Sequence, residues 1–466
     1  MKRKSLAAFL AALTAAACTV GPDFRRPVAA VPETFHGAAA PVGAAGDTTA
    51  LGDQPWWDVF QDDQLRELIR MALQQNLDLR IAAVRIVEAR ARFGVTRADQ
   101  FPTVDADAAA TRSRVARSVV PVALDPYERS DIRLTITAAW EVDFWGKYRR
   151  ATEAARAALV ATEWGRRAIA ASLVSQVGAA YFELRSLDVQ LDIATRALAS
   201  RREALRLTEV AARGGAISLL DVRQAEQLVF SAAATIADLN RQIEQLENYV
   251  STLLAVNPAT VRRGASVDQR IALPEVPVGL PSALLDRRPD INEAEQELIA
   301  ANANVGVAKA AFFPQLTLTG NGGVESAALS SILSQPAGLW SIGAALAQPI
   351  FNAGRTRSRV AVADAQREQA LLLYLQTVQQ SLREVSDALV ALHQGRLFRE
   401  QQEQLDRSAA DARRLAEIRY RGGATSFLEV LDSETRALSA QLGLAQAELA
   451  ERLALVQVYR ALGGGW

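Results

Sequence analysis

The sequence of 466 residues has a single cysteine, and only 6% of its residues are aromatic. One thiol cannot form a disulfide within the chain, so an internal disulfide framework is excluded. Lysine and arginine together number 52, and so do aspartate and glutamate, which leaves no basic excess for nucleic acid as a partner. Beyond the first residues there is also no run of about 18 apolar residues, so no transmembrane helix is predicted.

Signatures of catalysis are missing as well. The two histidines, His36 and His393, stand in different settings, and neither H-E-x-x-H nor G-x-S-x-G occurs. Residues 320–323 read GNGG but lack the lysine and the Ser or Thr of a phosphate-binding loop. Trp56 and Trp57 are compatible with stacking on a ligand, but packing of an amino-terminal arm against a helical body is the favoured interpretation. The sequence therefore predicts no enzyme and no metal site.

What the chain does contain is leucine, valine and alanine at heptad spacing. Four runs step by three and four residues, from Leu184 to Leu198, Leu239 to Leu253, Leu375 to Leu392 and Leu431 to Leu449. A sustained period near 3.5 predicts helices that supercoil and pack along their length. Because no proline occurs from 146 to 213, one helix of roughly 100 Å is expected there, at about 1.5 Å per residue.

Four shorter stretches alternate apolar and polar residues with a period of two, which is typical of β-strands. They lie at residues 103–110, 132–141, 315–319 and 339–346, and Phe-Pro precedes the first and the third. Alternation alone favours a soluble sheet with one buried face. Four membrane-spanning strands cannot close a barrel, and an open edge in lipid leaves backbone groups unpaired. If these strands span a membrane, several chains must therefore share one barrel.

The helical and strand patterns occur twice in the same order: helix, Phe-Pro, strand pair, long helix, Gly-Gly, helix. This order predicts a tandem repeat, with a first repeat at residues 61–256, a connector at 257–289 and a second repeat at 290–466. The two glycine pairs stand 422 − 214 = 208 residues apart. Because glycine tolerates the positive φ that a chain reversal requires, each pair is predicted to form the tip of a helical hairpin.

The amino-terminal residues predict export. Basic residues at positions 2–4, a short apolar run and three alanines form a signal peptide over residues 1–17, followed by an arm over 18–60. A small residue directly before a cysteine resembles bacterial lipoproteins, in which that cysteine is acylated and becomes the new amino terminus. The alanines also fit ordinary cleavage without acylation. Acylation is favoured, with N-palmitoyl and S-diacylglycerol groups expected on Cys18 and no other cofactor.

Five motifs together resemble the outer-membrane factors of tripartite efflux systems, the TolC-like family, and its lipoprotein branch in particular. They are CTVGPDFRRP (18–27), LPSALLDRRPDI (280–291), AAFFPQLTLT (310–319), AQPIFNAGR (347–355) and YRALGGGW (459–466). The resemblance implies an α+β membrane channel. In that fold each chain of a homotrimer gives four strands to a shared twelve-stranded transmembrane β-barrel in outer-membrane lipid, and its helices join a long periplasmic α-helical barrel.

The same resemblance implies a function and a set of partners. The protein would be a passive exit duct in the outer membrane of a Gram-negative bacterium. Drugs or other small molecules would reach it from an inner-membrane transporter, of the RND type, through a periplasmic adaptor protein. A lipid-anchored periplasmic coiled-coil scaffold or adaptor is the alternative, because it would share the heptads and Cys18. Neither a scaffold nor an adaptor needs paired membrane strands.

The resemblance also assigns site residues in both repeats. Adaptor contact falls on the small residues of the two tips, namely Gly214, Gly215, Ala216, Gly422, Gly423 and Ala424. A periplasmic gate falls on Leu428 and Asp432, with Glu429 as a neighbour. Leu428 and Asp432 are four residues apart and so share a helix face, and three copies would form an apolar ring and a carboxylate ring. The first repeat has Leu220 and Gln224 at these places, so only Asp432 supplies the acid.

Overall fold

The computed structural model describes residues 19–36, 51–60, 62–114, 116, 128–264 and 281–466. Cys18 and the predicted signal peptide therefore lie outside the described residues, as do parts of the predicted arm and connector. The chain divides into two compact units. Unit 1 is drawn from Met1–Val28, Arg85–Thr162 and Ala294–Tyr374, and unit 2 from Ala29–Val84, Glu163–Glu293 and Leu375–Trp466.

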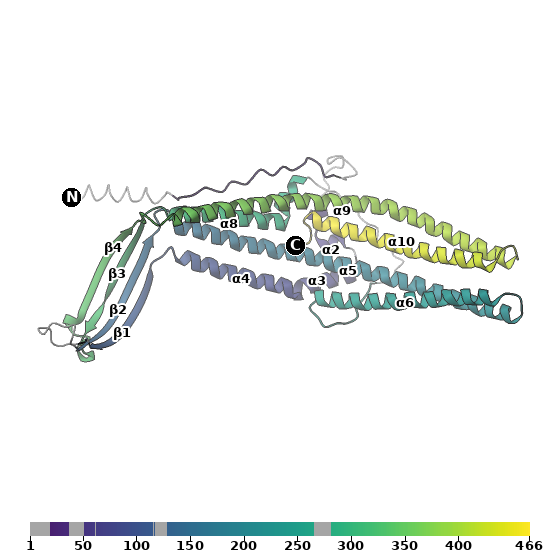
Figure 1. Ribbon diagram of the computed structural model, residues 1–466, viewed down its shortest axis with the longest axis horizontal. Coiled ribbons are helices and arrows are strands. Elements are labelled where there is room, and N and C mark those ends of the chain that lie inside the picture. Colours follow the sequence, from purple (N-terminus) through teal and green to yellow (C-terminus); the bar gives the residue numbers. More distant parts are fainter. Residues whose placement is uncertain (1–18, 37–50, 61, 115, 117–127, 265–280) are drawn as a thin grey trace. The chain divides into compact units, whose positions relative to one another are not determined.

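Helices make up most of the described chain (Figure 1). The α-helices are α2 (Trp56–Val59), α3 (Asp63–Gln75), α4 (Leu77–Ala98), α5 (Lys147–Arg213), α6 (Leu219–Leu253), α7 (Leu284–Arg287), α8 (Pro289–Ala310), α9 (Arg355–Arg421) and α10 (Phe427–Ala461). Single 3-10 turns lie at Leu51–Asp53, Pro281–Ala283, Leu329–Ser331 and Gln335–Ala337. None of the described helices combines the length and the hydropathy that crossing a membrane requires.

The same order of elements occurs twice. Helix α4, two strands, α5 and α6 are followed by α8, two strands, α9 and α10. Helices α5 and α9 have 67 residues each, and α6 and α10 have 35 each. The bounds of the first hairpin recur 208 residues later in the second, since 355 − 147 = 208 and 461 − 253 = 208. The predicted long helices and the internal repeat are thereby confirmed.

Heptad positions line the interior of unit 2. Leu184 of α5, Val250 of α6 and Val385 of α9 are almost completely buried, and Leu431 of α10 is buried as well. Burial of a leucine or valine side chain contributes roughly 1.5–3 kcal/mol relative to leaving it in water. The heptad positions therefore form the apolar contacts that the sequence predicted between these helices.

Unit 1 contains one antiparallel sheet. Its strands are β1 (Thr103–Arg114), β2 (Glu128–Val142), β3 (Gln315–Ser326) and β4 (Gly338–Ala347), in the order β1-β2-β3-β4 (Figure 1). The two predicted hairpins are thus joined through β2 and β3, with Ile136 opposite Gly322 and Gly322 opposite Trp340. Within the described residues, the outer edges of β1 and β4 pair with no strand.

The large apolar side chains of this sheet are exposed. Ile136, Trp340 and Ile342 lie on one face and are 59%, 79% and 84% exposed, whereas Thr135 on the other face is 7% exposed. A water-soluble sheet buries its apolar face and exposes its polar one. The interpretation that alternation alone favoured is therefore wrong, because alternation separates two faces without telling which of them faces outward.

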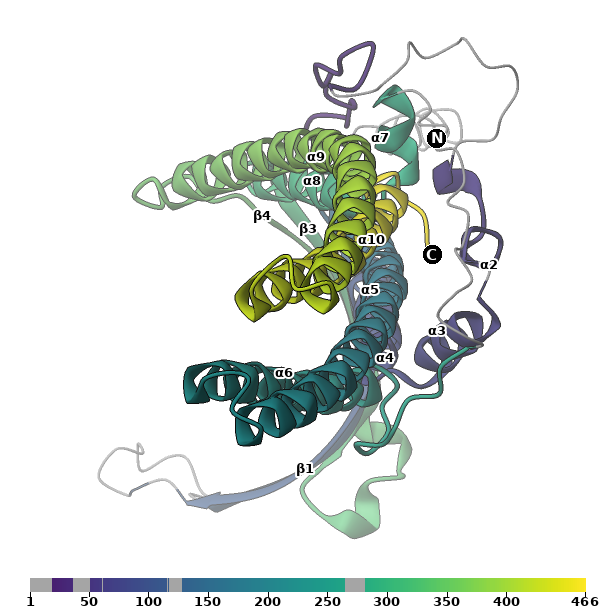
Figure 2. The same ribbon diagram turned by 90° about the vertical axis from the view of Figure 1, so that its right-hand side faces the viewer.

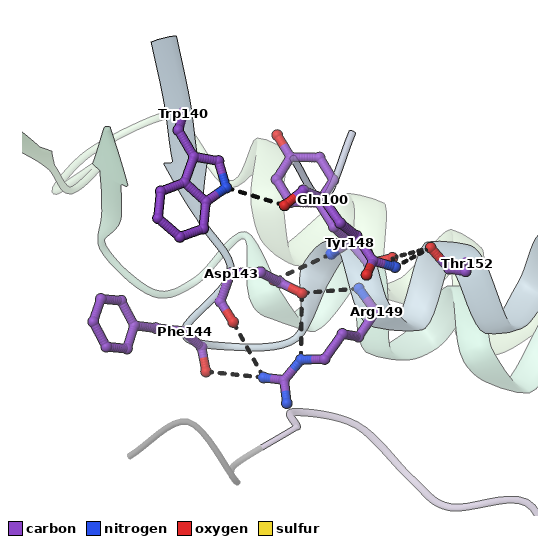
Figure 3. A network of polar contacts seen from close by, with 7 residues as sticks. All are labelled: Gln100, Trp140, Asp143, Phe144, Tyr148, Arg149 and Thr152. Carbon is purple, nitrogen blue, oxygen red and sulfur yellow. Dashed lines mark hydrogen bonds and ion pairs between the residues drawn. The ribbon is translucent and has the colours of Figure 1, made fainter. Parts of the chain in front are cut away.

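The turn from β2 into α5 is fixed by side chains from three elements (Figure 3). Asp143 accepts the backbone N–H groups of Tyr148 at 3.2 Å and Arg149 at 2.9 Å, and so satisfies donors at the start of α5. The Arg149 guanidinium donates back to the carbonyl of Asp143 at 3.1 Å. The Trp140 indole N–H donates to the carbonyl of Gln100, just past α4, at 3.0 Å. The start of α5 and the residue after α4 therefore hold the carboxyl end of β2 in place.

Candidate functional site at the hairpin tips

The two glycine pairs close two helical hairpins with the same backbone turn. Gly215 and Gly423 have φ values of +77° and +69°, the left-handed conformation that ends many helices. The hydrogen bonds that close the turns are Gly215 N–H to Ala212 O (3.0 Å), Ala216 N–H to Ala211 O (2.9 Å), Gly423 N–H to Tyr420 O (2.9 Å) and Ala424 N–H to Arg419 O (2.8 Å). Each tip is therefore a complete Schellman motif, which satisfies the last carbonyls of α5 and α9.

The tip residues project into open space. A Cβ atom added to Gly215 or Gly423 would meet no atom within 4 Å, so the backbone angle requires glycine and crowding does not. The six small residues assigned to adaptor contact, Gly214, Gly215, Ala216, Gly422, Gly423 and Ala424, are all exposed. Both tips lie at the same end of unit 2 (Figures 1 and 2). The structure thus brings together at one end two sets of residues that the sequence separates.

The returning helix of the first hairpin starts with a capping box. The Ser218 hydroxyl accepts the N–H of Asp221 at 3.3 Å, and the Asp221 carboxylate accepts the N–H of Ser218 at 3.0 Å. Two donors at the start of α6 are thereby satisfied, and the carboxylate lies where the helix dipole favours negative charge. The acid of the first tip is used to hold its own helix.

The returning helix of the second hairpin starts differently. Ser426 makes no capping bond with its side chain. Glu429, the counterpart of Asp221, instead accepts a hydrogen bond from the Arg419 guanidinium at 2.8 Å and another from the Thr425 hydroxyl. The acid of the second tip therefore links the end of α9 to the start of α10.

Leu428 and Asp432 lie one turn apart on α10 and are both exposed, with Leu428 57% exposed. The Asp432 carboxylate pairs with the Arg436 guanidinium at 2.9 Å, one further turn along. In the first repeat Leu220 is likewise exposed. The apolar residue of the predicted gate thus recurs in both hairpins, whereas its carboxylate does not.

A groove of about 880 Å³ runs between α9 and α10 beside these residues. Asp432 and Glu429 line it, together with the small residues Ala409, Ala412, Ala416, Ser433, Ala440 and Gly443. Small side chains on both walls leave room for another helix to approach the backbone closely. The acidic side chains give the groove a polar rim near the tip.

Comparison with known proteins assigns the family. The family model described as outer membrane efflux protein matches residues 68–256 and 280–464. The solvent efflux pump outer membrane protein SrpC of Pseudomonas putida is 36% identical over 100% of this chain and 99% of its own length. The cation efflux system protein CusC of Escherichia coli is 32% identical over 98% of both chains. The open-state outer membrane channel MtrE of Neisseria gonorrhoeae has a TM-score of 0.86 at 31% identity, over 96% of this chain and 98% of that one.

The chain belongs to the outer membrane efflux protein family. Its relatives are channel proteins, so this efflux protein is a channel of the outer membrane with its helical part in the periplasm. The TolC-like α+β fold, the family and the localisation predicted from the sequence are confirmed. The scaffold or adaptor alternative is wrong, because relatives match the whole chain and are outer membrane efflux proteins.

A half-buried acid, Glu434, lies on α10 close to the exposed Asp432. Burial raises the pKa of Glu434, an effect that Arg201 opposes, Glu417 reinforces and Arg413 opposes. Burial lowers the pKa of Arg201, and Glu434 counteracts this. Glu434 therefore lies among charges from α5 and α9, in contrast to the exposed carboxylate of Asp432.

The partners of Glu429 in the efflux protein were not predicted from the sequence. Arg419 and Thr425 flank the glycine pair, and Ala211 and Ile217 stand at the same places in the first repeat. An arginine at position 419, where the first repeat has Ala211, was the signal that could have identified its pair with Glu429. In the part of the chain that the structure describes, no cluster of three metal-binding side chains occurs.

Proposed function

We propose that three copies of this chain form the exit duct of a tripartite efflux pump. The observation that carries the proposal is the sheet of unit 1, whose two edges are unpaired within the described residues and whose apolar face is exposed. Backbone groups at a free edge cost several kcal/mol each in lipid, so an isolated sheet of four strands is not viable there. Three such sheets paired edge to edge would form a closed barrel of twelve strands.

The duct receives its cargo from a periplasmic adaptor that docks on the hairpin tips, and the adaptor links it to an inner-membrane transporter of the RND type. Exposed glycines and alanines support this docking, because small side chains let two backbones come close. The groove between α9 and α10 offers a second wall of small residues for a helix of the adaptor.

The gate lies in the second repeat. In a trimer, three Leu428 side chains would form an apolar constriction that resists wetting, and three Asp432 carboxylates would concentrate cations beside it. The bond between Arg419 and Glu429 holds the tip of α10 and keeps this face in place. Opening requires that this bond be broken or exchanged.

The cargo is small molecules without a common chemistry. Relatives at similar identity are named for the efflux of solvents and of cations. A passive duct with one gate supports such breadth, because selection is left to the transporter that supplies it.

The amino terminus is anchored by acylation of Cys18. Residues just beyond it are held on unit 1, since the Val20 N–H donates to the Trp145 carbonyl at 3.0 Å and Asp23 pairs with Arg150 at 2.7 Å. A lipid on Cys18 would therefore lie close to unit 1, the unit that carries the strands. Mass spectrometry of the mature amino terminus tests this proposal, and an unmodified cysteine would refute the anchor.

The oligomer itself is tested by native mass spectrometry of the full chain purified in detergent. Three chains per particle are expected, and the assembly should dissociate only on heating. A monomer that remains soluble after removal of the lipid would contradict the proposal and favour a protein that does not share its barrel.

A further inference from the structure

Unit 2 also contains a pocket of about 560 Å³ whose lining includes none of the tip or proposed gate residues. Its lining includes Trp57 and Trp466, which are 51% and 49% exposed, over Tyr459, which is buried. The volume lies within the roughly 300–1,000 Å³ of small-molecule sites. The pocket thus presents large aromatic side chains that the described protein leaves half uncovered.

The pocket is assembled from five separate parts of the chain, at residues 52–57, 73–79, 166–170, 287 and 459–466. The Tyr459 hydroxyl donates to the Gln54 carbonyl at 2.8 Å and so holds the first part against the last. The rings of Trp56 and Trp57 meet edge to face at 5.4 Å. Packing of the arm on the helical body, the favoured interpretation of these tryptophans, accounts for Tyr459 and Gln54 but leaves the Trp57 side chain exposed.

The charges of the pocket are unbalanced. Its lining carries Arg166, Arg167, Arg287 and Asp53, a net charge of 3 − 1 = +2. Arg287 is already paired with Asp53 at 2.5 Å. Neither Arg166 nor Arg167 has an ion-pair partner among the described residues. An anionic ligand would therefore meet two available guanidinium groups.

One of these guanidinium groups is held in place by aromatic rings. The Arg167 guanidinium carbon lies 4.2 Å from the ring centroid of Trp164 and 4.7 Å from that of Trp466. The two rings are themselves edge to face at 5.6 Å. Cation–π contacts fix the plane of the guanidinium without using its N–H donors, which stay free to bind a carboxylate through two parallel bonds.

We propose that this pocket binds a carboxylate-bearing saccharide of the bacterial cell wall. A sugar ring has an apolar face of C–H groups that packs on an indole, which suits Trp57 and Trp466. Its carboxylate would be held by Arg167, with Arg166 beside it. The helical part of the protein lies in the periplasm, where the cell-wall polymer provides this combination of groups. The site would tether the channel to the wall, and it requires neither the trimer nor the gate proposed above.

The test is a titration of the full-length protein in detergent with N-acetylmuramyl-L-alanyl-D-isoglutamine, a soluble probe with one sugar ring and one carboxylate. Calorimetry should detect saturable binding that Arg167→Gln weakens about tenfold, as expected for loss of a charge-assisted bidentate contact. Trp57→Ala should weaken it by a smaller factor. Arg156→Gln removes an exposed arginine from the same helix and should leave the affinity unchanged.

Two further probes separate the contributions of the sugar and the carboxylate. The neutral N,N′-diacetylchitobiose and the peptide without its sugar should each bind about tenfold more weakly than the complete probe. Equal affinity for the charged and the neutral sugar would overturn the role of the carboxylate. Equal affinity of the peptide alone would overturn the role of the aromatic surface.

Other outcomes concern the site as a whole. Equal weakening by Arg167→Gln and Arg156→Gln would overturn the assignment of the pocket, as would the absence of wild-type binding both to the probe and to sedimented cell-wall sacculi. Circular dichroism checks the fold of every variant. If Arg167→Gln does not fold, Arg166→Gln replaces it, because that arginine is exposed and its removal leaves the ring cluster intact.

Discussion

The two hairpin tips have the same backbone conformation but differ in their side-chain contacts. Both end in a Schellman turn with a glycine at positive φ, and both place an acid in the first turn of the returning helix. In the first tip Asp221 caps α6 through Ser218. In the second tip Glu429 reaches back across the turn to Arg419. The comparison shows that the same helical turn can be stabilised by different polar contacts in the two repeats.

The different contacts lead us to expect that the first tip is a static support and that the second tip moves. A capping box satisfies backbone donors locally and makes no demand on the neighbouring helix. A bond between the ends of α9 and α10 instead has to break when these ends move apart. The second tip also carries the carboxylate of Asp432 where the first has Gln224. We therefore expect the gate to depend on the second repeat and the first repeat to serve as its support.

The largest effect is expected where bulk is added to a tip. Gly423→Trp should abolish drug export while leaving a folded oligomer, because the side chain would fill the open space at the tip, where we propose that the adaptor docks. Its strain at positive φ is only about 1–2 kcal/mol. Export is measured as drug resistance of cells that lack their own channel.

Gly215→Trp and Gly94→Trp complete that experiment. Gly215→Trp tests whether both tips contact the adaptor, and Gly94→Trp adds the same bulk to an open position on α4 and should preserve export. Normal export by a folded Gly423→Trp oligomer would refute docking at this tip.

The next effect should come from the polar contact that differs between the tips. Arg419→Gln leaves Glu429 without its ion pair and should raise the conductance of the channel several-fold. Asp221→Asn removes the charge from the capping box of α6, which weakens the cap, and should leave conductance unchanged. Single-channel recording measures the first effect, and hydrogen exchange at residues 214–222 the second. Equal opening by both variants would show that the tips are equivalent.

Charge selectivity should respond in opposite directions in the two repeats. Asp432→Asn removes a carboxylate near the proposed constriction and should lower cation over anion permeability, whereas Gln224→Asp adds one at the equivalent place and should raise it. The reversal potential in a salt gradient reports both changes. If neither variant shifts it, these positions do not face the conducting path.

The smallest effect is expected from the half-buried Glu434. Because burial raises the pKa of Glu434 above its unfolded value of 4.5, its contribution to stability is complete below that pH and is lost as the pH rises through the folded pKa. Glu434→Gln should therefore raise the melting temperature slightly at pH 7 and not at pH 4. Glu226→Gln removes the counterpart in the first repeat, which already has an ion-pair partner in Arg223 at 2.6 Å, and should show no such gain. Parallel pH profiles for the wild type and Glu434→Gln would contradict the burial argument.

The sequence predicted what depends on local pattern. Heptad spacing located the long helices, and the two glycine pairs located their reversals, because supercoiling and positive φ are read from a few neighbouring residues. The strands were found by alternation, but the outward direction of Ile136 and Trp340 was not, since it depends on what surrounds the sheet.

Contacts between distant segments could not be predicted in the same way. The clamp on Arg167 joins residues 164 and 466, and no local signal links them. The bond from Arg419 to Glu429 spans only ten residues. It forms only because the acid pairs across the turn and does not cap its own helix, as Asp221 does in the first tip. The neighbouring side chains determine which contact forms. Ser218 completes the cap in the first tip, and Thr425 and Arg419 bind the acid in the second.

The assignment of the gate to the second repeat is tested most directly in a planar bilayer. Conductance and selectivity of the wild type are compared with those of the double variant Leu428→Ser with Asp432→Ala. The matched control is Leu220→Ser with Gln224→Ala, which makes the same changes at the equivalent places of the first repeat. The account predicts a small wild-type conductance that becomes large and less cation-selective only in the second-repeat variant. An equal change in both variants, or a change in the first-repeat variant alone, would contradict it.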